Sequence, residues 1–464
     1  MKNFVIESVS EGIERQVREV FAEHHLVGVS IGIVRDGELV WKRGFGYADL
    51  ASGRRADEDT LYRVASITKT FTGTAIFQLR DEGRLDLDDP IVEHIPEFAA
   101  VRARKGSVEG VTLRRMLCHH SGLVGEIPGD HWETLNFPAM QELLAALPEV
   151  EVVLEQDSAF KYSNLAFALL GEVVARISGR PYTEVCARPD PGTPRHDRHH
   201  LRAERCPAPP EATGYQVRPH EDAPSVAPHP PLNGKVAGGG LYSCVTDLAR
   251  WVTLHLRTDA PGREGAQALA GRSLKEMQRP QFVEPGWNAG YGLPWRGQRI
   301  GRDIYLGHGG GLPGFLTQIL FCPERRLGLI ALTNADGHSA NVLPRLIETL
   351  TKAEDERPRD ITLEKPMPTP EAWKEFVGAY VWGTLGARVS VECRGGALLL
   401  VSPPVAGKPT PPVRLESTDD PDAFIETSGR GAGEVMRFRR DKDGRVTGYT
   451  TTGFPWWKLA SAGL

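Results

Sequence analysis

A serine and a lysine three residues apart stand where an irregular stretch turns into a predicted helix over residues 67–82. Residues i and i+3 share a helix face, so the amine of Lys69 can approach the hydroxyl of Ser66. A lysine in a dry cleft near other cations has a depressed pKa and can accept the serine proton. The N–H of Ser66 can point at a developing oxyanion. The pair predicts a nucleophilic serine; a helix cap beside a solvated lysine is the structural alternative.

A tyrosine and an asparagine precede a second predicted helix, over residues 163–178. The phenol of Tyr162 could relay a proton between Ser66 and a leaving group, provided that nearby positive charge lowers its pKa. The amide of Asn164 could hydrogen-bond both Lys69 and a substrate amide. Taken alone, a tyrosine before a helix is ordinary half-buried core.

One histidine and three glycines, His308-Gly309-Gly310-Gly311, end a strand predicted over residues 304–308. The glycines let a ligand backbone approach closely, and the N–H of Gly311 could complete an oxyanion hole. Taken alone, this run is a glycine-rich turn.

The order and spacing of these three motifs resemble the serine β-lactamase and penicillin-binding-protein superfamily. The resemblance is to its class C β-lactamase-like branch, which includes D-stereospecific aminopeptidases, DD-peptidases and family VIII carboxylesterases. Other segments that resemble this branch are residues 45–49, 61–65, 117–123, 237–243 and 308–315. The resemblance covers residues 10–350, apart from the stretch 186–210.

The resemblance implies roles for seven residues, namely Ser66 as nucleophile, Lys69 as base partner, Tyr162 as proton relay, and Asn164, His308, Gly310 and Gly311 around the substrate and oxyanion. His308 departs from the family pattern, because many relatives have the lysine of a Lys-Thr-Gly triplet there. A neutral imidazole binds a substrate carboxylate less well than a lysine does. This departure disfavours avid β-lactam hydrolysis and peptides anchored by a carboxylate.

The implied reaction is acyl transfer to Ser66 followed by hydrolysis, with no metal and no organic cofactor. We expect a carboxylesterase or peptidase acting on small ester or amide substrates, with at most weak β-lactamase activity. A D-amino-acid-specific peptidase or a penicillin-binding protein is the enzymatic alternative. A catalytically silent binding or scaffold protein with the same fold is the non-enzymatic one. The segments 124–140 and 275–300 are expected to be loops that set the substrate.

The elements that must position these residues point to an α/β (α+β) fold. Residues 27–41 read as a hairpin around an Asp36-Gly37 turn. Further expected helices lie at 10–24, 112–118, 246–257 and 340–353, and further strands at 317–321 and 328–334. The resemblance implies an antiparallel sheet made from both chain ends and flanked by helices, plus a helical subdomain, with the site between them.

A second, smaller domain is expected at the C-terminal end. Residues 1–353 form the predicted hydrolase domain, and the charged, proline-rich residues 354–370 read as a linker. Within 371–464, the segments 386–393, 397–402, 433–439 and 445–450 alternate like strands. This part resembles the lipocalin-like β domain of some family members. Its aromatic residues Tyr380, Phe454, Trp456 and Trp457 read as core or docking groups.

Composition narrows the class of protein further. The 464 residues are 40% hydrophobic and 25% charged with a net charge of −5, so nucleic acid is not an expected partner. We see neither a signal peptide nor an apolar run long enough for a bilayer, so we expect a cytoplasmic protein without a membrane partner. The six scattered cysteines read as reduced thiols. A homo-oligomer is compatible with these features.

The stretch 186–210 is the one segment that fits no element. Its histidines, His196, His199 and His200, together with His220, match no known metal-ligand spacing. However, codons exist for residues 189–201 that, read one base later, encode Arg-Ile-Leu-Gly-Pro-Leu-Gly-Met-Thr-Asp-Thr-Thr. That peptide is an ordinary helix end and turn.

We therefore predict two compensating frameshifts around residues 186–210, with the frame restored before Ala212. Resequencing the coding DNA tests this prediction. Codons for residues 189–201 that cannot be read as the alternative peptide would contradict it. If the prediction holds, these histidines carry no function.

Overall fold

The two ends of the first unit meet in its central sheet, where β1 (Gly28–Arg35) pairs antiparallel with β16 (Leu327–Thr333). The computed structural model describes residues 2–23, 26–187, 200–201, 211–217, 223–257, 269–335, 369–382, 387–394, 396–403, 412–428, 432–451 and 454–459. The chain divides into two compact units, Met1–Arg357 and Pro358–Leu464. The predicted helix 340–353, most of the linker 354–370 and most of the stretch 186–210 lie outside the described residues.

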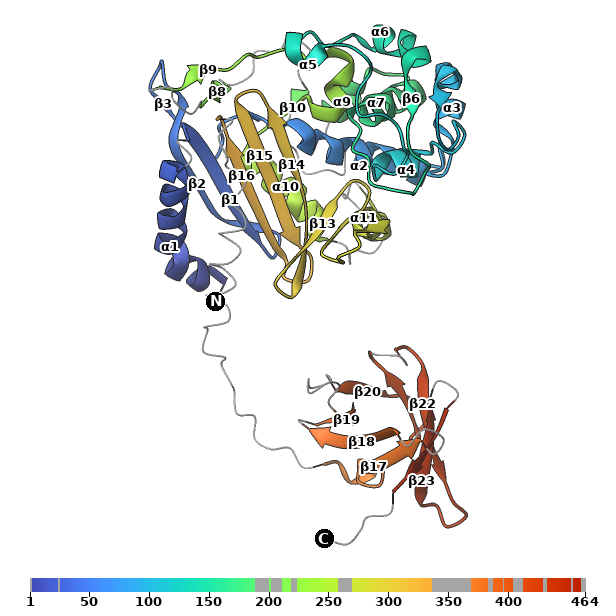
Figure 1. Ribbon diagram of the computed structural model, residues 1–464. Coiled ribbons are helices and arrows are strands. Elements are labelled where there is room, and N and C mark those ends of the chain that lie inside the picture. Colours follow the sequence, from blue (N-terminus) through green and yellow to red (C-terminus); the bar gives the residue numbers. More distant parts are fainter. Residues whose placement is uncertain are drawn as a thin grey trace. The chain divides into compact units, whose positions relative to one another are not determined.

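The sheet of the first unit has nine strands in the order β11-β12-β13-β14-β15-β16-β1-β2-β3 (Figure 1). Its other strands are β2 (Glu38–Asp49), β3 (Arg54–Arg55), β11 (Phe282–Val283), β12 (Ala289–Tyr291), β13 (Arg296–Ile300), β14 (Asp303–Leu312) and β15 (Phe315–Cys322). The predicted hairpin is confirmed, because Asp36 and Gly37 join β1 to β2 with φ angles of 54° and 85°. Two positive φ angles in a row are the signature of a type I′ hairpin turn.

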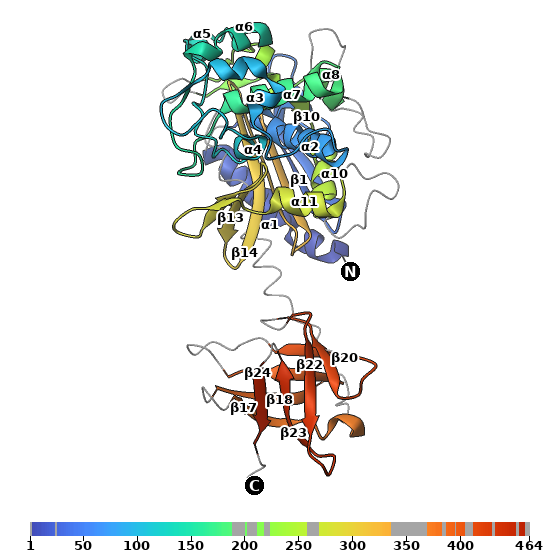
Figure 2. The ribbon, with the colours of Figure 1, turned by 90° about the vertical axis from the view of Figure 1, so that its right-hand side faces the viewer.

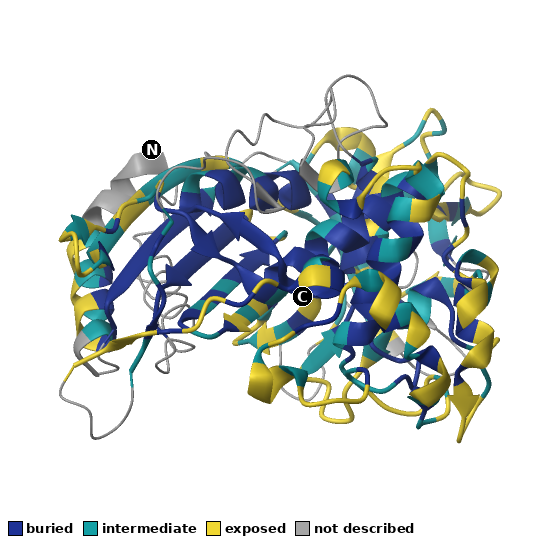
Figure 3. Ribbon diagram, turned by 90° about the horizontal axis from the view of Figure 1, so that it is seen from above, coloured by how far each residue is buried: buried dark blue, intermediate teal, exposed yellow. Residues whose placement is uncertain are grey.

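Helices cover both faces of this sheet. On one face, α1 (Lys2–Glu23) buries Ile13, Val17 and Val20 in the same cluster as Val29 and Ile31 of β1. On the other, α10 (Val245–Leu256) lies so close that a Cβ on Gly32 would be 2.4 Å from Val245. Strands β1 and β16 are therefore buried almost throughout (Figure 3). The predicted antiparallel sheet between helices is confirmed.

The helical part of the first unit gathers around α7 (Asn164–Ser178) (Figure 2). The hydroxyl of Ser163 accepts a hydrogen bond from the N–H of Ala166 at its start, and Gly179, with φ 68°, ends it. Of the other helices of this unit, α2 (Thr68–Asp81), α4 (Leu113–Leu117), α8 (Tyr182–Ala187) and α9 (Val236–Gly239) contact α7. The unit also contains α3 (Ile91–His94), α5 (His131–Thr134), α6 (Met140–Ala145) and α11 (Gly271–Gln278). Because α7 is apolar on nearly every face, it forms the middle of this subdomain.

Short elements complete the unit. The 3₁₀ turns are η1 (Ala65–Ile67), η2 (Pro96–Ala100), η3 (Leu147–Glu149) and η4 (Asn233–Lys235). The short strands are β4 (Tyr62–Arg63), β10 (Leu241–Ser243) and β7 (His200–Leu201) in one sheet, with the pairs β5 (Arg102–Ala103) and β6 (Glu151–Val152), and β8 (Tyr215–Gln216) and β9 (Ser225–Val226).

Three sequence predictions about elements were wrong in extent. The first helix begins at Lys2 instead of residue 10. The segment 275–300 is not a loop, because it contains most of α11 and all of β11, β12 and β13. The glycines after His308 do not form a turn: β14 continues through them to Leu312, since β15 pairs with every one of them.

The second unit is a closed eight-stranded barrel. Its strands are β17 (Gly378–Trp382), β18 (Ala387–Arg394), β19 (Ala397–Val401), β20 (Val413–Ser417), β21 (Ala423–Glu426), β22 (Val435–Arg440), β23 (Val446–Thr451) and β24 (Phe454–Lys458), preceded by η6 (Glu371–Trp373). Sequence alternation had predicted only four of them, β18, β19, β22 and β23. Tyr380 lies in the core and donates a hydrogen bond to the carbonyl of Phe376 at 2.6 Å, whereas Trp457 is about half exposed. The likeness of this barrel to lipocalins stays a prediction.

Candidate active site

Ser66 lies in the 3₁₀ turn η1, directly before α2. The preceding residue, Ala65, has a φ of 48°, a left-handed conformation that is uncommon and unfavourable for alanine. Hydrogen bonds on both sides hold the turn: the hydroxyl of Thr68 donates to the carbonyl of Ala65, and the N–H of Val64 donates to the carbonyl of Leu241. The surrounding structure thus keeps the serine on a sharply bent, fixed backbone.

The amine of Lys69 is fully buried and has three polar neighbours. Its Nζ lies 2.7 Å from the carbonyl oxygen of Gly238, 2.8 Å from Oδ1 of Asn164 and 3.1 Å from Oγ of Ser66. The two carbonyl-type oxygens can only accept hydrogen bonds. A neutral amine, with two N–H groups and one lone pair, would therefore donate to both of them and turn its lone pair towards the hydroxyl of Ser66.

Burial is the main reason why the pKa of Lys69 falls to about 7. The carboxylate of Glu126 opposes this shift, and the ammonium of Lys235 adds to it. A substantial fraction of Lys69 is consequently neutral near pH 7, as a general base requires. The predicted approach of Lys69 to Ser66 along one helix face is what the structure shows.

Tyr162 lies beside the same serine, close enough for Ser66 to act on its pKa. The Nζ of Lys69 lies 5.1 Å from the centre of its ring. The condition set for this relay, that nearby positive charge lowers the pKa of Tyr162, is not met, because burial raises that pKa to about 12. Tyr162 is a neutral phenol near pH 7, so it can pass on a proton but is not a phenolate base.

Asn164 connects Lys69 to an ion pair that sequence reasoning missed. Its Nδ2 donates a hydrogen bond of 2.7 Å to Oε1 of Glu126, which also accepts one of 2.8 Å from the indole of Trp132. The other carboxylate oxygen of Glu126 lies 2.5 Å from Nζ of the buried Lys235. Glu126 and Trp132 fall in the segment 124–140 expected to shape the site. No local pattern marked Lys235, which stands three residues before the glycine run 238–240.

Strand β14 brings the predicted glycines to the nucleophile. Its pairing with β13 ends at Gly307, and its next residues contact η1. A Cβ on Gly310 would lie 2.1 Å from the carbonyl oxygen of Val64, so only glycine allows this approach. Gly311 is the next residue of the same strand.

His308 also lies at the site, but as a neutral group. Its Nδ1 is 2.7 Å from the carbonyl oxygen of Gly309, which can only accept, so Nδ1 carries the proton. Its Nε2 then accepts a hydrogen bond from the hydroxyl of Tyr291 at 3.2 Å. Burial, together with the charge of Lys69, lowers the pKa of His308 to about 3. Tyr291 is a second contact that sequence reasoning missed, because β12 brings it from the segment 275–300.

His119, in the turn after α4, packs against two residues that precede α7. The N–H of Ser163 donates to its Nδ1 at 3.1 Å, and its ring centre lies 4.2 Å from that of Tyr162. Burial lowers the pKa of His119 well below its usual value. The turn thereby fixes the residue between Tyr162 and Asn164.

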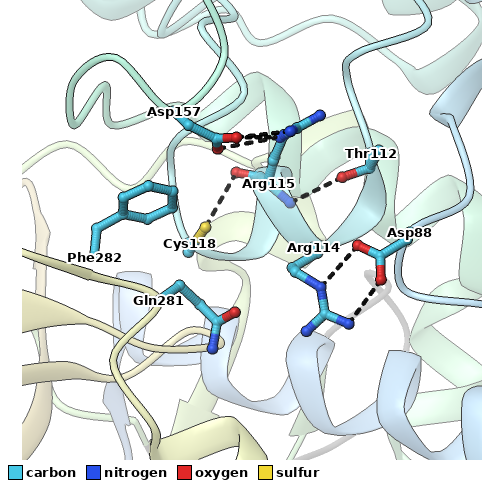
Figure 4. A pocket seen from close by; sticks show the side chains of 8 residues that line it. All are labelled: Asp88, Thr112, Arg114, Arg115, Cys118, Asp157, Gln281 and Phe282. Atoms are coloured by element: carbon cyan, nitrogen blue, oxygen red, sulfur yellow. Dashed lines mark hydrogen bonds and ion pairs between the residues drawn. The ribbon is translucent and has the colours of Figure 1, made fainter.

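A separate cavity of about 380 Å³ lies beside α4 (Figure 4). The guanidinium of Arg114 binds the carboxylate of Asp88 at 2.8 Å and 2.9 Å, and that of Arg115 binds Asp157. Burial raises the pKa of Cys118, also in the lining, to about 12, so its thiol is a poor nucleophile. The cavity contains none of the predicted site residues, and its arginine charges are matched by carboxylates.

The described part of the chain contains no cluster of three or more His, Cys, Asp or Glu side chains that could hold a metal. Among its helices, none has the length and apolar character needed to cross a bilayer. The histidines His196, His199 and His220 lie outside the described residues.

Comparison with known proteins identifies the family. A family model described as Beta-lactamase matches residues 13–351, so the chain belongs to the β-lactamase family, whose members are typically serine hydrolases. Protein flp of Staphylococcus aureus (strain N315) is 26% identical over 340 residues, which cover 73% of this chain but only 65% of flp. The D-alanyl-D-alanine-carboxypeptidase/endopeptidase AmpH of Escherichia coli (strain K12) is 27% identical over 343 residues, covering 69% of this chain and 83% of AmpH.

Solved structures share the fold. An octameric penicillin-binding protein homologue from Pyrococcus abyssi superposes with a TM-score of 0.62 at 24% identity. The match covers 97% of this chain and 100% of the Pyrococcus abyssi chain, so it extends over the barrel as well. A β-lactamase/D-alanine carboxypeptidase from Pseudomonas syringae superposes with a TM-score of 0.61 at 20% identity, over 74% of this chain and 99% of that one.

The approach of β14 to the nucleophile can be tested with two neighbouring glycines. We predict that Gly310→Ala lowers stability by about 1–3 kcal/mol, because its methyl group meets backbone that must move. We also predict that it slows labelling of Ser66 by a fluorophosphonate at least tenfold. In Gly309→Ala, the new Cβ would meet only a carbonyl oxygen at 3.7 Å, so both properties should change little. Equal effects of the two substitutions would show that the contact with Val64 does not matter.

Proposed function

We propose that this chain is a serine hydrolase that forms an acyl-enzyme on Ser66. The observation that carries the proposal is the geometry of Lys69, a buried amine with two fixed carbonyl acceptors and Oγ of Ser66 as its third neighbour. A base positioned in this way can accept the proton of Ser66 as the hydroxyl attacks an acyl carbon.

In the proposed reaction, the bond from Oγ of Ser66 to the acyl carbon forms while the serine proton moves to Lys69. The negative charge on the acyl oxygen would be stabilised by the N–H groups of Ser66 and Gly311, with Gly310 allowing the close approach. The bond to the leaving group then breaks. Tyr162 donates its proton to that group and regains one from Lys69. A water molecule then attacks the acyl carbon and loses a proton to the same pair of groups. The bond from the acyl carbon to Oγ of Ser66 breaks, the pair returns a proton to Oγ, and the acid is released.

We further propose that the substrates are small esters or amides without a carboxylate next to the reacting carbonyl. Both nitrogens of His308 are engaged, and its low pKa keeps it neutral, so it supplies no positive charge for a carboxylate. Two exposed aromatic side chains border the site: Trp132 binds Glu126, and Phe160 lies 5.2 Å from Tyr291. Apolar groups on the substrate would gain from contact with these rings.

A D-amino-acid-specific peptidase or a penicillin-binding protein is a second candidate, favoured by the similarity to AmpH, which is described as a D-alanyl-D-alanine-carboxypeptidase/endopeptidase. The non-enzymatic candidate is a binding or scaffold protein. The contact between Lys69 and Ser66 argues against it, because a scaffold gains nothing from burying a lysine amine whose hydrogen-bond partners carry no charge. Assembly into a homo-oligomer stays a prediction; the Pyrococcus abyssi protein with this fold is octameric.

We predict that the protein hydrolyses short p-nitrophenyl esters faster than D-amino acid amides, and turns over nitrocefin slowly. Parallel assays of the three substrates, with Ser66→Ala as the control, measure this order. A fluorophosphonate should label the unmodified chain on Ser66, which peptide mass spectrometry locates. Failure of folded protein to react would favour the scaffold candidate. Efficient nitrocefin turnover would contradict the role given to His308.

A further inference from the structure

The side-chain amide of Asn164 has an oxygen that accepts hydrogen bonds and a nitrogen that donates them, and each has a partner in the structure. Its Oδ1 accepts a hydrogen bond from Lys69 at 2.8 Å, and its Nδ2 donates one to Glu126 at 2.7 Å. A carboxylate can only accept hydrogen bonds, so Glu126 selects the orientation in which Nδ2 points towards it and Oδ1 towards Lys69.

The opposite orientation would disable the base. If the amide turned by 180°, Nδ2 would face Nζ of Lys69, and a neutral amine could meet it only by offering its lone pair. That lone pair would then no longer face Ser66. The orientation of Asn164 therefore decides whether Lys69 can accept the serine proton.

Glu126 is itself held in place by two further groups. The indole of Trp132 donates to its Oε1 at 2.8 Å, and Nζ of Lys235 lies 2.5 Å from its Oε2. The ammonium of Lys235 also lies 4.8 Å from the ring centre of Trp132 and 4.7 Å from that of Phe137. With only 7% of the Lys235 side chain exposed and 28% of the Glu126 side chain, solvent screens this pair weakly.

We propose that the ion pair of Glu126 and Lys235 is a positioning device for the base: Glu126 orients Asn164 so that the lone pair of Lys69 faces Ser66, and Lys235 balances the charge that Glu126 brings. This inference rests on the proposed function, in which Lys69 is the base. It adds two residues that contact neither Ser66 nor Lys69 by any hydrogen bond that the structure describes.

The charges around Lys69 make the balance testable. From β14, His308 is neutral because its pKa is about 3, and from the turn after α4, His119 is neutral because its pKa is lower than usual. Tyr162, before α7, is neutral because its pKa is about 12. The ionised groups that act on the pKa of Lys69 are Glu126, which raises it, and Lys235, which lowers it. If one of these two charges is removed, the other alone shifts the pKa of Lys69.

The experiment measures the second-order rate of fluorophosphonate labelling of the full chain between pH 5 and pH 9. The acid limb of this profile follows the deprotonation of Lys69. Glu126→Gln removes the charge but keeps an oxygen for Asn164, so the limb should move to lower pH. Lys235→Met keeps an apolar stem between the two rings, and the limb should move to higher pH. Each shift should be about half a pH unit or more, and the double substitution should return the limb close to its original position.

A third variant tests orientation separately from charge. Glu126→Leu removes the acceptor that the described residues provide for Nδ2 of Asn164. The plateau rate at high pH should therefore fall by about 10-fold to 100-fold, part of the ~10²–10⁴-fold that a positioned base contributes. Glu126→Gln should keep most of that plateau. If Glu126 had a purely structural role, Glu126→Leu would have a lower melting temperature, but its plateau rate would equal that of Glu126→Gln.

The ion pair of Lys42 and Glu58, 3.0 Å apart, provides matched controls. Lys42→Met and Glu58→Gln remove the same charges from a site that does not act on the pKa of Lys69, and should leave the profile unchanged. Shifts of the same sign in Glu126→Gln and Lys235→Met, or no shift in either, would overturn this inference while leaving the proposed function intact. Because glutamine is isosteric, Glu126→Gln alone decides the sign if Lys235→Met does not fold. Absence of labelling in the unmodified chain would overturn the proposed function and this inference together.

Discussion

Burying an amine is the physical constraint on which the rest of the site depends. A lysine ammonium loses most of its hydration in the interior, so burial favours the neutral form. The fold limits this cost by surrounding Nζ of Lys69 with three oxygens, from Ser66, Asn164 and Gly238. These oxygens come from η1, α7 and α9, three segments far apart in the sequence. Packing of the helical subdomain is thus the condition for the chemistry, because the amine has the right partners only when these segments meet.

In the proposed function, specificity depends on a different part of the structure, the edge of β14 beyond its pairing with β13. The sheet provides this edge because the pairing of β14 with β13 ends at Gly307, and the small size of Gly310 lets β14 lie against the nucleophile turn. His308 is the first residue of this edge, and its buried, neutral imidazole is hydrogen-bonded to Tyr291. The same edge therefore supplies polar backbone groups for a substrate while withholding a positive charge. In the proposed function, this combination separates catalytic competence, which would lie with Lys69, from the choice of acyl group.

The sequence predicted the parts of the site whose position is local. Ser66 and Lys69 share one helical face, and Tyr162 and Asn164 flank the start of α7, so spacing and order were enough to select them. Glu126, Lys235 and Tyr291 escaped prediction because tertiary packing alone brings them to Asn164 and His308. Prediction of the fold likewise succeeded where the signal is local, as at the turn of Asp36 and Gly37 and in the apolar α7. The strands β11 to β13 are short, and β14 contains consecutive glycines, which locally resemble a turn and become a strand only through pairing with β15.

The proposed reaction requires Lys69 to be substantially neutral at physiological pH. Its pKa can be measured directly by NMR of protein labelled with ¹⁵N and ¹³C in its lysine side chains, with Lys69→Met used to assign the resonance. This account predicts titration of Lys69 near pH 7, well separated from the other lysines. A pKa near the ordinary lysine value of about 10.4 would contradict the account, because Lys69 would then be an ammonium that cannot accept the proton of Ser66.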